Sequence, residues 1–138
     1  MRPRSFALAV AASCLVNIAA GCTPQNAPAV ERRAPTPVID EALLARAVIV
    51  DVRTPQEHAA DGHMQGDHNI PVDDLQGRLA DVTALLGGDT TRPVVVYCRS
   101  GRRSARAKSV LDQAGFATVV DAGGYGDLAG KFPQRASR

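Results

Sequence analysis

The sequence is poor in aromatic residues, with no tryptophan, three phenylalanines and two tyrosines in 138 residues. Its charge is nearly balanced, because 16 basic residues stand against 14 acidic ones. A nucleic-acid-binding surface usually needs a broad basic face with aromatic side chains interleaved. We therefore expect no nucleic-acid partner.

The apolar run near the start is too short to cross a bilayer comfortably, since a spanning helix needs about 20 apolar residues. This run, residues 6–16, follows Arg2 and Arg4 and precedes three small residues at 19–21. A positive start, a short apolar core and a small-residue end predict a secretory signal peptide over residues 1–21. We therefore expect an exported protein.

The next residue is Cys22, and AAGC at 19–22 resembles the lipobox of bacterial lipoproteins, in which the cysteine becomes the lipidated N-terminus. The resemblance implies a membrane anchor at Cys22 on the periplasmic or cell-envelope side. Lipoboxes usually have Leu where this chain has Ala19, so cleavage to a soluble protein is the alternative. Four prolines and no aliphatic periodicity in residues 22–37 predict a flexible tether.

Cysteine is scarce, and its three positions leave no pair for an internal disulfide. Cys14 would leave with the signal peptide and Cys22 would be lipidated, so Cys98 would be alone. An unpaired thiol in an oxidising compartment needs a chemical reason. A buried, inert cysteine is the alternative, but the glycine and arginines that follow Cys98 favour a reactive thiol.

Positive charge concentrates just after Cys98. Removal of residues 1–21 would take away two arginines and no acidic residue, which leaves 14 of the 16 basic residues against 14 acidic ones. Five cations still fall within ten residues: Arg99, Arg102, Arg103, Arg106 and Lys108. They predict a local site for a small anion, with a solvated helix face as the alternative for the last two.

The chain from residue 38 onward alternates apolar runs with helical patterns. We expect strands over residues 47–50, 94–98 and 117–120, and helices over 41–47, from 55 to about 60, 73–86, 104–114 and 125–130. Thr54, Pro55 and Glu57 predict an N-terminal capping box for the second helix. This alternation predicts a three-layer α/β fold with a mainly parallel central sheet.

Cys98 falls where a strand passes through a tight Gly- and Arg-rich loop into a helix. Ligands of parallel sheets bind at the carboxyl ends of the strands. Loop N–H groups and the first helical turn would supply partial positive charge to the sulfur. Such placement lowers a thiol pKa from about 8.5 to about 3.5–7.5, so Cys98 is predicted to be a nucleophilic thiolate.

Two motifs together resemble one family. DVRTPQEHAADGHMQGDHNIP, residues 51–71, resembles the first signature of rhodanese-homology domains, and CRSGRRS, residues 98–104, resembles their active-site loop. The resemblance covers residues 38–133 and leaves 134–138 as a polar tail. It implies a single rhodanese-like domain of the single-domain thiosulfate sulfurtransferase type, which needs no cofactor.

The resemblance also implies the chemistry. Cys98 would carry sulfane sulfur as a persulfide, taken from thiosulfate or another small anionic sulfur donor and passed to a thiol or cyanide. A sulfur carrier or partner-binding module without turnover is the alternative. Related phosphatases have a seven-residue loop, in which Arg occupies the position of Ser104. The six-residue loop here, Cys98 to Arg103, suits a single sulfur atom rather than phosphate.

We expect the loop residues to bind the anionic sulfur and its donor: Arg99, Ser100, Gly101, Arg102, Arg103 and Ser104. The loop N–H groups would hold the sulfur, and Arg102 or Arg103 would balance the charge of the incoming dianion. Arg99 could instead point outward and only keep the site electropositive.

Residues outside the loop are expected to have structural roles. Asp51 and Arg53 match the family's DxR positions and predict an ion pair that braces the loop. His58, His63 and His68 lie on different local structures and are not expected to converge, so we expect no metal site. Asp67 stands where the family usually has a small residue, which affects the expected local packing.

Overall fold

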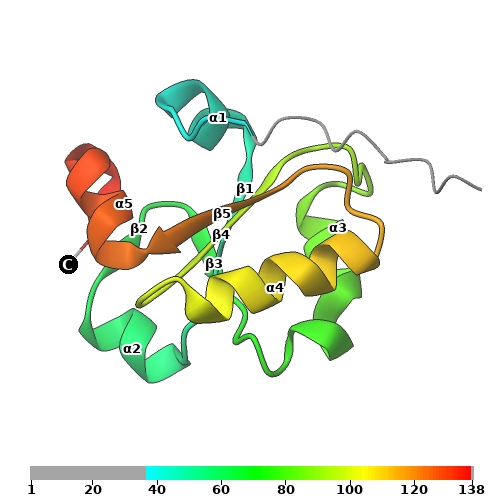
Figure 1. The fold of residues 1–138 in the computed structure, drawn as a ribbon, viewed down its shortest axis with the longest axis horizontal. Coiled ribbons are helices and arrows are strands. Elements are labelled where there is room, and N and C mark those ends of the chain that lie inside the picture. Colours follow the sequence, from blue (N-terminus) through cyan, green and yellow to red (C-terminus); the bar gives the residue numbers. More distant parts are fainter. Residues whose placement is uncertain (1–36, 138) are drawn as a thin grey trace, which may run out of the picture. The chain divides into compact units, whose positions relative to one another are not determined.

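The computed structural model describes residues 37–137. The elements in chain order (Figure 1) are α1 (Glu41–Arg46), β1 (Val48–Asp51), α2 (Pro55–Ala60), β2 (His63–Met64), β3 (Asp67–Asn69), the 3-10 helix η1 (Leu75–Arg78), α3 (Leu79–Leu85), β4 (Val94–Cys98), α4 (Arg102–Gln113), β5 (Val119–Gly124), α5 (Tyr125–Lys131), the 3-10 helix η2 (Pro133–Arg135) and β6 (Ala136–Ser137). The predicted signal peptide, Cys14, Cys22 and the tether up to residue 36 lie outside the described residues. None of the helices in residues 37–137 has the length and apolar character needed to cross a membrane.

Four strands form one parallel sheet in the order β3-β1-β4-β5. Every residue of β1 and β4 is buried, as expected for central strands covered on both faces. A separate antiparallel pair joins β2 to β6. The predicted mainly parallel sheet is therefore confirmed.

Helices cover both faces of the sheet (Figure 1). Consecutive side chains of a strand point to opposite faces, so Val96 and Cys98 pack in one cluster and Val95 and Tyr97 in the other. The first cluster includes residues of α3 and α4, and the second includes residues of α1 and α5. This arrangement confirms the three predicted layers.

Short helices begin where the sequence places side-chain caps. Asp40 Oδ1 accepts the N–H of Leu43 at 2.7 Å at the start of α1. At α2 the Thr54 hydroxyl accepts the N–H of Glu57 at 3.2 Å, and Glu57 Oε2 accepts the N–H of Thr54 at 3.0 Å. Both contacts of the predicted capping box are present.

Two element predictions were wrong. The single helix expected over 73–86 is divided into η1 and α3, because Arg78 leaves helical geometry with φ −116° and ψ 23°. Gly77 directly before it has weak helical preference. The strand expected over 117–120 instead runs from Val119 to Gly124 as β5, with an irregularity in its pairing with β4. Gly123 has φ +74°, a conformation that suits a glycine at a β-bulge.

The residues of the predicted polar tail take part in the fold as far as Ser137. Strand β6 pairs with β2, and Arg135 O accepts the N–H of Gln65 at 2.7 Å. The Tyr125 hydroxyl donates to Ser137 O at 3.0 Å. The C-terminal segment therefore ties β2 to α5.

Candidate active site

Cys98 ends β4 and is completely buried. Its Sγ accepts the N–H of Gly101 at 3.1 Å and lies 3.8 Å from Ser104 Oγ. Burial acts to raise the pKa of the thiol, but hydrogen bonds from the N–H groups of Ser104, Ser100 and Gly101 and from the Ser104 side chain outweigh it. The pKa of Cys98 is therefore held below its ordinary value, as the sequence predicts.

The loop turns at Gly101, which has φ +90° and ψ −23° and precedes the twelve-residue helix α4. The glycines at the end of β5 pack closely behind it. A Cβ on Gly101 would lie 3.6 Å from Gly123 Cα, and one on Gly124 would lie 3.0 Å from Arg99 O. Small residues on both segments thus let the two backbones meet, and the loop N–H groups point at the sulfur.

Arg103 forms a bidentate ion pair with Glu57, and both N···O distances are 2.7 Å. The Arg103 guanidinium holds the pKa of Glu57 well below its usual range, at about 2. The pKa of Arg103 is raised, chiefly by Glu57 and also by Cys98. Sequence reasoning missed Glu57 as a site residue, because its place in the capping box gave no sign of a partner 46 positions away.

The other loop arginines are exposed. Neither Arg99 nor Arg102 has an ion pair within residues 37–137, whereas Arg106 pairs with Asp73 at 2.8 Å and Lys108 with Asp112 at 3.0 Å. The charges of Arg99 and Arg102 therefore face solvent beside the loop. The charge of Arg106 is paired with Asp73, which precedes η1, and that of Lys108 with Asp112 on α4, so neither cation is free at the loop.

The comparisons with known proteins agree on one family. Residues 38–129 match the rhodanese-like domain family. The chain is a member of that family. It is 40% identical over 80 residues to the thiosulfate sulfurtransferase PspE of Escherichia coli (strain K12), a match that covers 58% of this chain and 72% of PspE.

Solved structures of rhodaneses share the fold. The human single-domain sulfurtransferase TSTD1 is 32% identical with a TM-score of 0.57, over 71% of this chain and 97% of that one. An E. coli rhodanese solved with anions is 36% identical with a TM-score of 0.54, over 60% of this chain and 92% of that one. The predicted rhodanese fold is thus confirmed.

Asp51 and Arg53 of the rhodanese-like domain form a buried ion pair at the carboxyl end of β1. Arg53 Nε lies 2.8 Å from Asp51 Oδ2, and Arg53 Nη2 lies 2.6 Å both from that oxygen and from Gly62 O. The guanidinium also lies over the rings of Tyr97 and Tyr125, at 5.5 and 4.8 Å from their centroids. Arg53 therefore joins β1 to the end of α2 and to α5. Within residues 37–137 it forms no hydrogen bond or ion pair with Cys98.

The three histidines do not behave alike. The expectation that they would not converge is wrong for His58 and His63, whose rings stack with centroids 4.2 Å apart and an interplanar angle of 20°. Both contact Asp67, at 3.1 Å each. His68 is exposed and stands outside this group. Asp67 was expected only to affect the local packing, but its carboxylate contacts both histidine rings.

Proposed function

We propose that this rhodanese-like domain is a sulfurtransferase that carries sulfane sulfur as a persulfide on Cys98. The observation that carries the proposal is the thiol with a lowered pKa, which accepts the N–H of Gly101 at 3.1 Å. The names of relatives such as PspE and TSTD1 support the same activity. The six-residue loop favours sulfur as the cargo over phosphate.

In the first half-reaction the Cys98 thiolate attacks the outer sulfur of thiosulfate. The sulfur–sulfur bond of thiosulfate breaks, sulfite leaves with the electron pair, and Cys98 becomes a persulfide anion. The total charge does not change in this step. The N–H groups that hold the thiolate would then hold the persulfide sulfur.

In the second half-reaction a thiolate or cyanide attacks the outer persulfide sulfur. The new bond joins that sulfur to the acceptor, the persulfide bond breaks, and its electron pair returns to Cys98 as the thiolate. The product is a new persulfide or thiocyanate. No cofactor takes part in either step.

Arg99 and Arg102 are the cations we assign to the incoming dianion. Both are exposed at the loop and have no ion pair within residues 37–137. Arg103 is less suited to this role than the sequence suggested, since Glu57 already neutralises it. We assign Arg103 to orienting the loop and Asp51 with Arg53 to structural support.

A sulfur carrier without rapid turnover is the second candidate, and the burial of Cys98 favours it. The cysteine is 0% exposed, so a donor reaches the sulfur only if the loop moves. A protein partner that displaces the loop would meet this requirement. In that case the domain would accept persulfide from a protein and turn over small donors slowly.

Thiocyanate formation from thiosulfate and cyanide tests the enzyme proposal. The parent protein and Cys22→Ser, a cysteine change outside the domain, should both be active, and Cys98→Ser should be inactive. Equal rates in the parent and Cys98→Ser would refute the mechanism. A stable mass gain of about 32 Da on Cys98 without thiocyanate formation would identify the carrier instead.

We also propose that the protein is exported and lipid-anchored at Cys22. The support is the signal-like pattern of residues 1–21 and the lipobox-like AAGC. Expressed in a bacterium that processes lipoproteins, the parent should partition into detergent and Cys22→Ala into the aqueous phase. An aqueous parent protein would rule the anchor out and support release after ordinary cleavage.

A further inference from the structure

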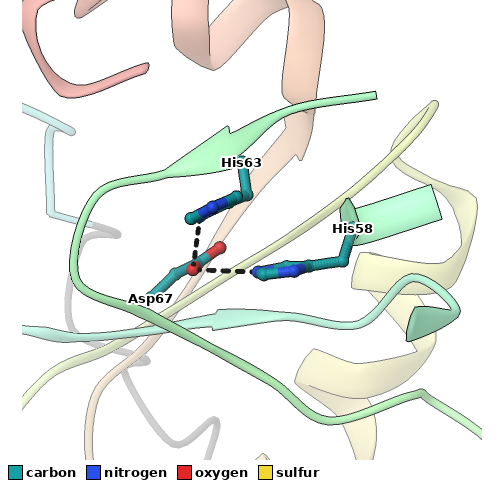
Figure 2. A group of neighbouring side chains, drawn as sticks. All are labelled: His58, His63 and Asp67. Atoms are coloured by element: carbon teal, nitrogen blue, oxygen red, sulfur yellow. Dashed lines mark hydrogen bonds and ion pairs between the residues drawn. The ribbon is translucent and has the colours of Figure 1, made fainter. Parts of the chain in front are cut away.

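Two imidazoles converge on one carboxylate at the start of β3 (Figure 2). His58 Nε2 and His63 Nδ1 each lie 3.1 Å from the same oxygen, Asp67 Oδ1. One ligand atom from each of the three residues lies within 4.8 Å of the others. The group therefore offers two nitrogens and one oxygen to a single point.

The fold creates this convergence from three short elements. His58 is on α2, His63 is on β2 and Asp67 begins β3. Gly62 and Gly66 both have φ +77°, which allows the chain to turn sharply before β2 and again before β3. These two turns bring Asp67 back beneath both histidine rings.

The carboxylate of Asp67 is held from its other side. The Tyr97 hydroxyl donates to Asp67 Oδ2, and Tyr97 Oη in turn accepts the N–H of Met64 at 3.1 Å. The Asp67 side chain is 2% exposed, whereas those of His58 and His63 are 23% and 34% exposed. Oδ1 is thus oriented toward the rings, and the rings are open to solvent on one side.

We propose that His58, His63 and Asp67 bind a divalent transition-metal ion, with Zn²⁺ as the best match. Zinc sites with two imidazoles, one carboxylate and an open fourth position are well known, with ligand distances of about 2.0–2.2 Å. Two tetrahedral ligands at such distances are separated by roughly 3.3 Å. The two nitrogen–oxygen distances of 3.1 Å are already close to that value.

Ion binding requires a small rearrangement. The stacked rings must tilt apart so that both lone pairs meet at the ion, and their partial exposure gives them room. Each neutral ring keeps its single proton on the nitrogen that does not bind. His63 Nδ1 also lies 3.1 Å from Met64 O, and this contact is exchanged for the bond to the ion.

The proposed metal site is separate from the sulfur site and does not rest on the proposed function. Tyr97 and Cys98 are consecutive in β4, so their side chains lie on opposite faces of the sheet. The hydroxyl that orients Asp67 and the reactive sulfur therefore belong to different layers. Metal binding can therefore be tested in a variant that has no cysteine.

The test is a titration with Zn²⁺ and with Co²⁺ of the chain in which Cys14, Cys22 and Cys98 are all changed to alanine. This background prevents a thiolate from binding the ion. Calorimetry gives affinity and stoichiometry, and the visible absorbance of Co²⁺ reports tetrahedral coordination. We expect one ion per chain.

In the same background, His58→Ala, His63→Ala, Asp67→Asn and Asp67→Ala should each weaken binding at least about tenfold. Tyr97→Phe keeps the ring but removes the donor to Asp67 and should weaken binding by roughly 10- to 100-fold. His68→Ala is the matched control, since His68 is on the same strand as Asp67 and outside the group. Its affinity should equal that of the parent.

Absence of one-to-one binding at micromolar protein, or equal losses in His68→Ala and His58→Ala, would overturn the proposal. So would unchanged affinity in either Asp67 variant. Circular dichroism restricts the comparison to variants that keep the parent spectrum. If one variant does not fold, the other substitution at Asp67 and the two single histidine substitutions still test the site.

Discussion

Two opposing effects act on the pKa of the Cys98 thiol. Complete burial disfavours the charged thiolate, while the hydrogen bonds of the loop favour it, and the loop prevails. The donors are mostly main-chain N–H groups whose directions depend on the turn at Gly101. The lowered pKa of Cys98 therefore depends on backbone geometry more than on any one neighbouring side chain.

The first prediction concerns the titration of Cys98. Its thiolate should form with a midpoint below about 8.5, the value of a free cysteine, because the loop donors stabilise the anion. The ultraviolet absorbance of the thiolate, recorded against pH as the difference between the parent and Cys98→Ser, isolates this residue from the other cysteines. A midpoint at or above that of a free cysteine would contradict the loop's proposed effect.

The second prediction concerns Gly101. Alanine at φ +90° should cost about 1–3 kcal/mol of unfolding free energy and shift the Cys98 midpoint upward, because the turn that aims the N–H groups is strained. Gly77→Ala is the control, since Gly77 has no positive φ and open space around its Cβ position. Urea unfolding gives the free energy of each variant, and the ultraviolet absorbance of the thiolate gives its Cys98 midpoint. Equal effects of the two substitutions would show that the turn has no special role.

At the scale of elements, the ion pair of Glu57 with Arg103 links α2 to the start of α4. The third prediction is that Glu57→Gln lowers stability by about 0.5–1 kcal/mol at pH 7. Glutamine still suits the capping box, so the change isolates the ion pair. Asp73→Asn, which breaks the more exposed pair with Arg106, should cost less.

The pH dependence of this pair has a definite sign. The pKa of Glu57 falls from 4.5 to about 2 on folding, so its stabilisation is complete above pH 4.5 and is lost as the pH falls toward 2. The stability difference between the parent and Glu57→Gln should therefore shrink over that range. A difference that stays constant from pH 5 to pH 2 would contradict the assignment.

Local patterns predicted single elements well and contacts between them poorly. The capping box of α2 and the buried strand before Cys98 follow from adjacent residues, and both were confirmed. Glu57 satisfied its local role completely, so nothing in the sequence indicated its second partner. The break at Arg78 also went unpredicted, because the apolar spacing of residues 75–86 suits one continuous helix.

At the scale of the whole molecule, the sequence predicted the three layers and the place of Cys98 at the end of a buried strand. It could not predict how short polar segments meet. Residues 136–137 have no strand pattern, yet they pair with β2. His58, His63 and Asp67 converge only because β2 and β3 fold back beside α2, a placement set by tertiary packing rather than by spacing.

Arg53 connects the layers, and its loss is the fourth prediction. Arg53→Met would leave the buried carboxylate of Asp51 without its cation and would remove the contacts with Gly62 O and Tyr125. Breaking a buried pair on one side typically costs about 3–5 kcal/mol, a large share of the roughly 5–15 kcal/mol that stabilises a domain. Urea unfolding should show this loss for Arg53→Met, whereas Arg135→Met, at a more exposed pair with Glu41, should lose less than about 1 kcal/mol.

Because neutralising the stranded carboxylate removes most of the penalty, adding Asp51→Asn to Arg53→Met should restore part of the stability. A double variant no more stable than Arg53→Met would show that the contacts with Gly62 and Tyr125, rather than the ion pair, hold this end of the domain together.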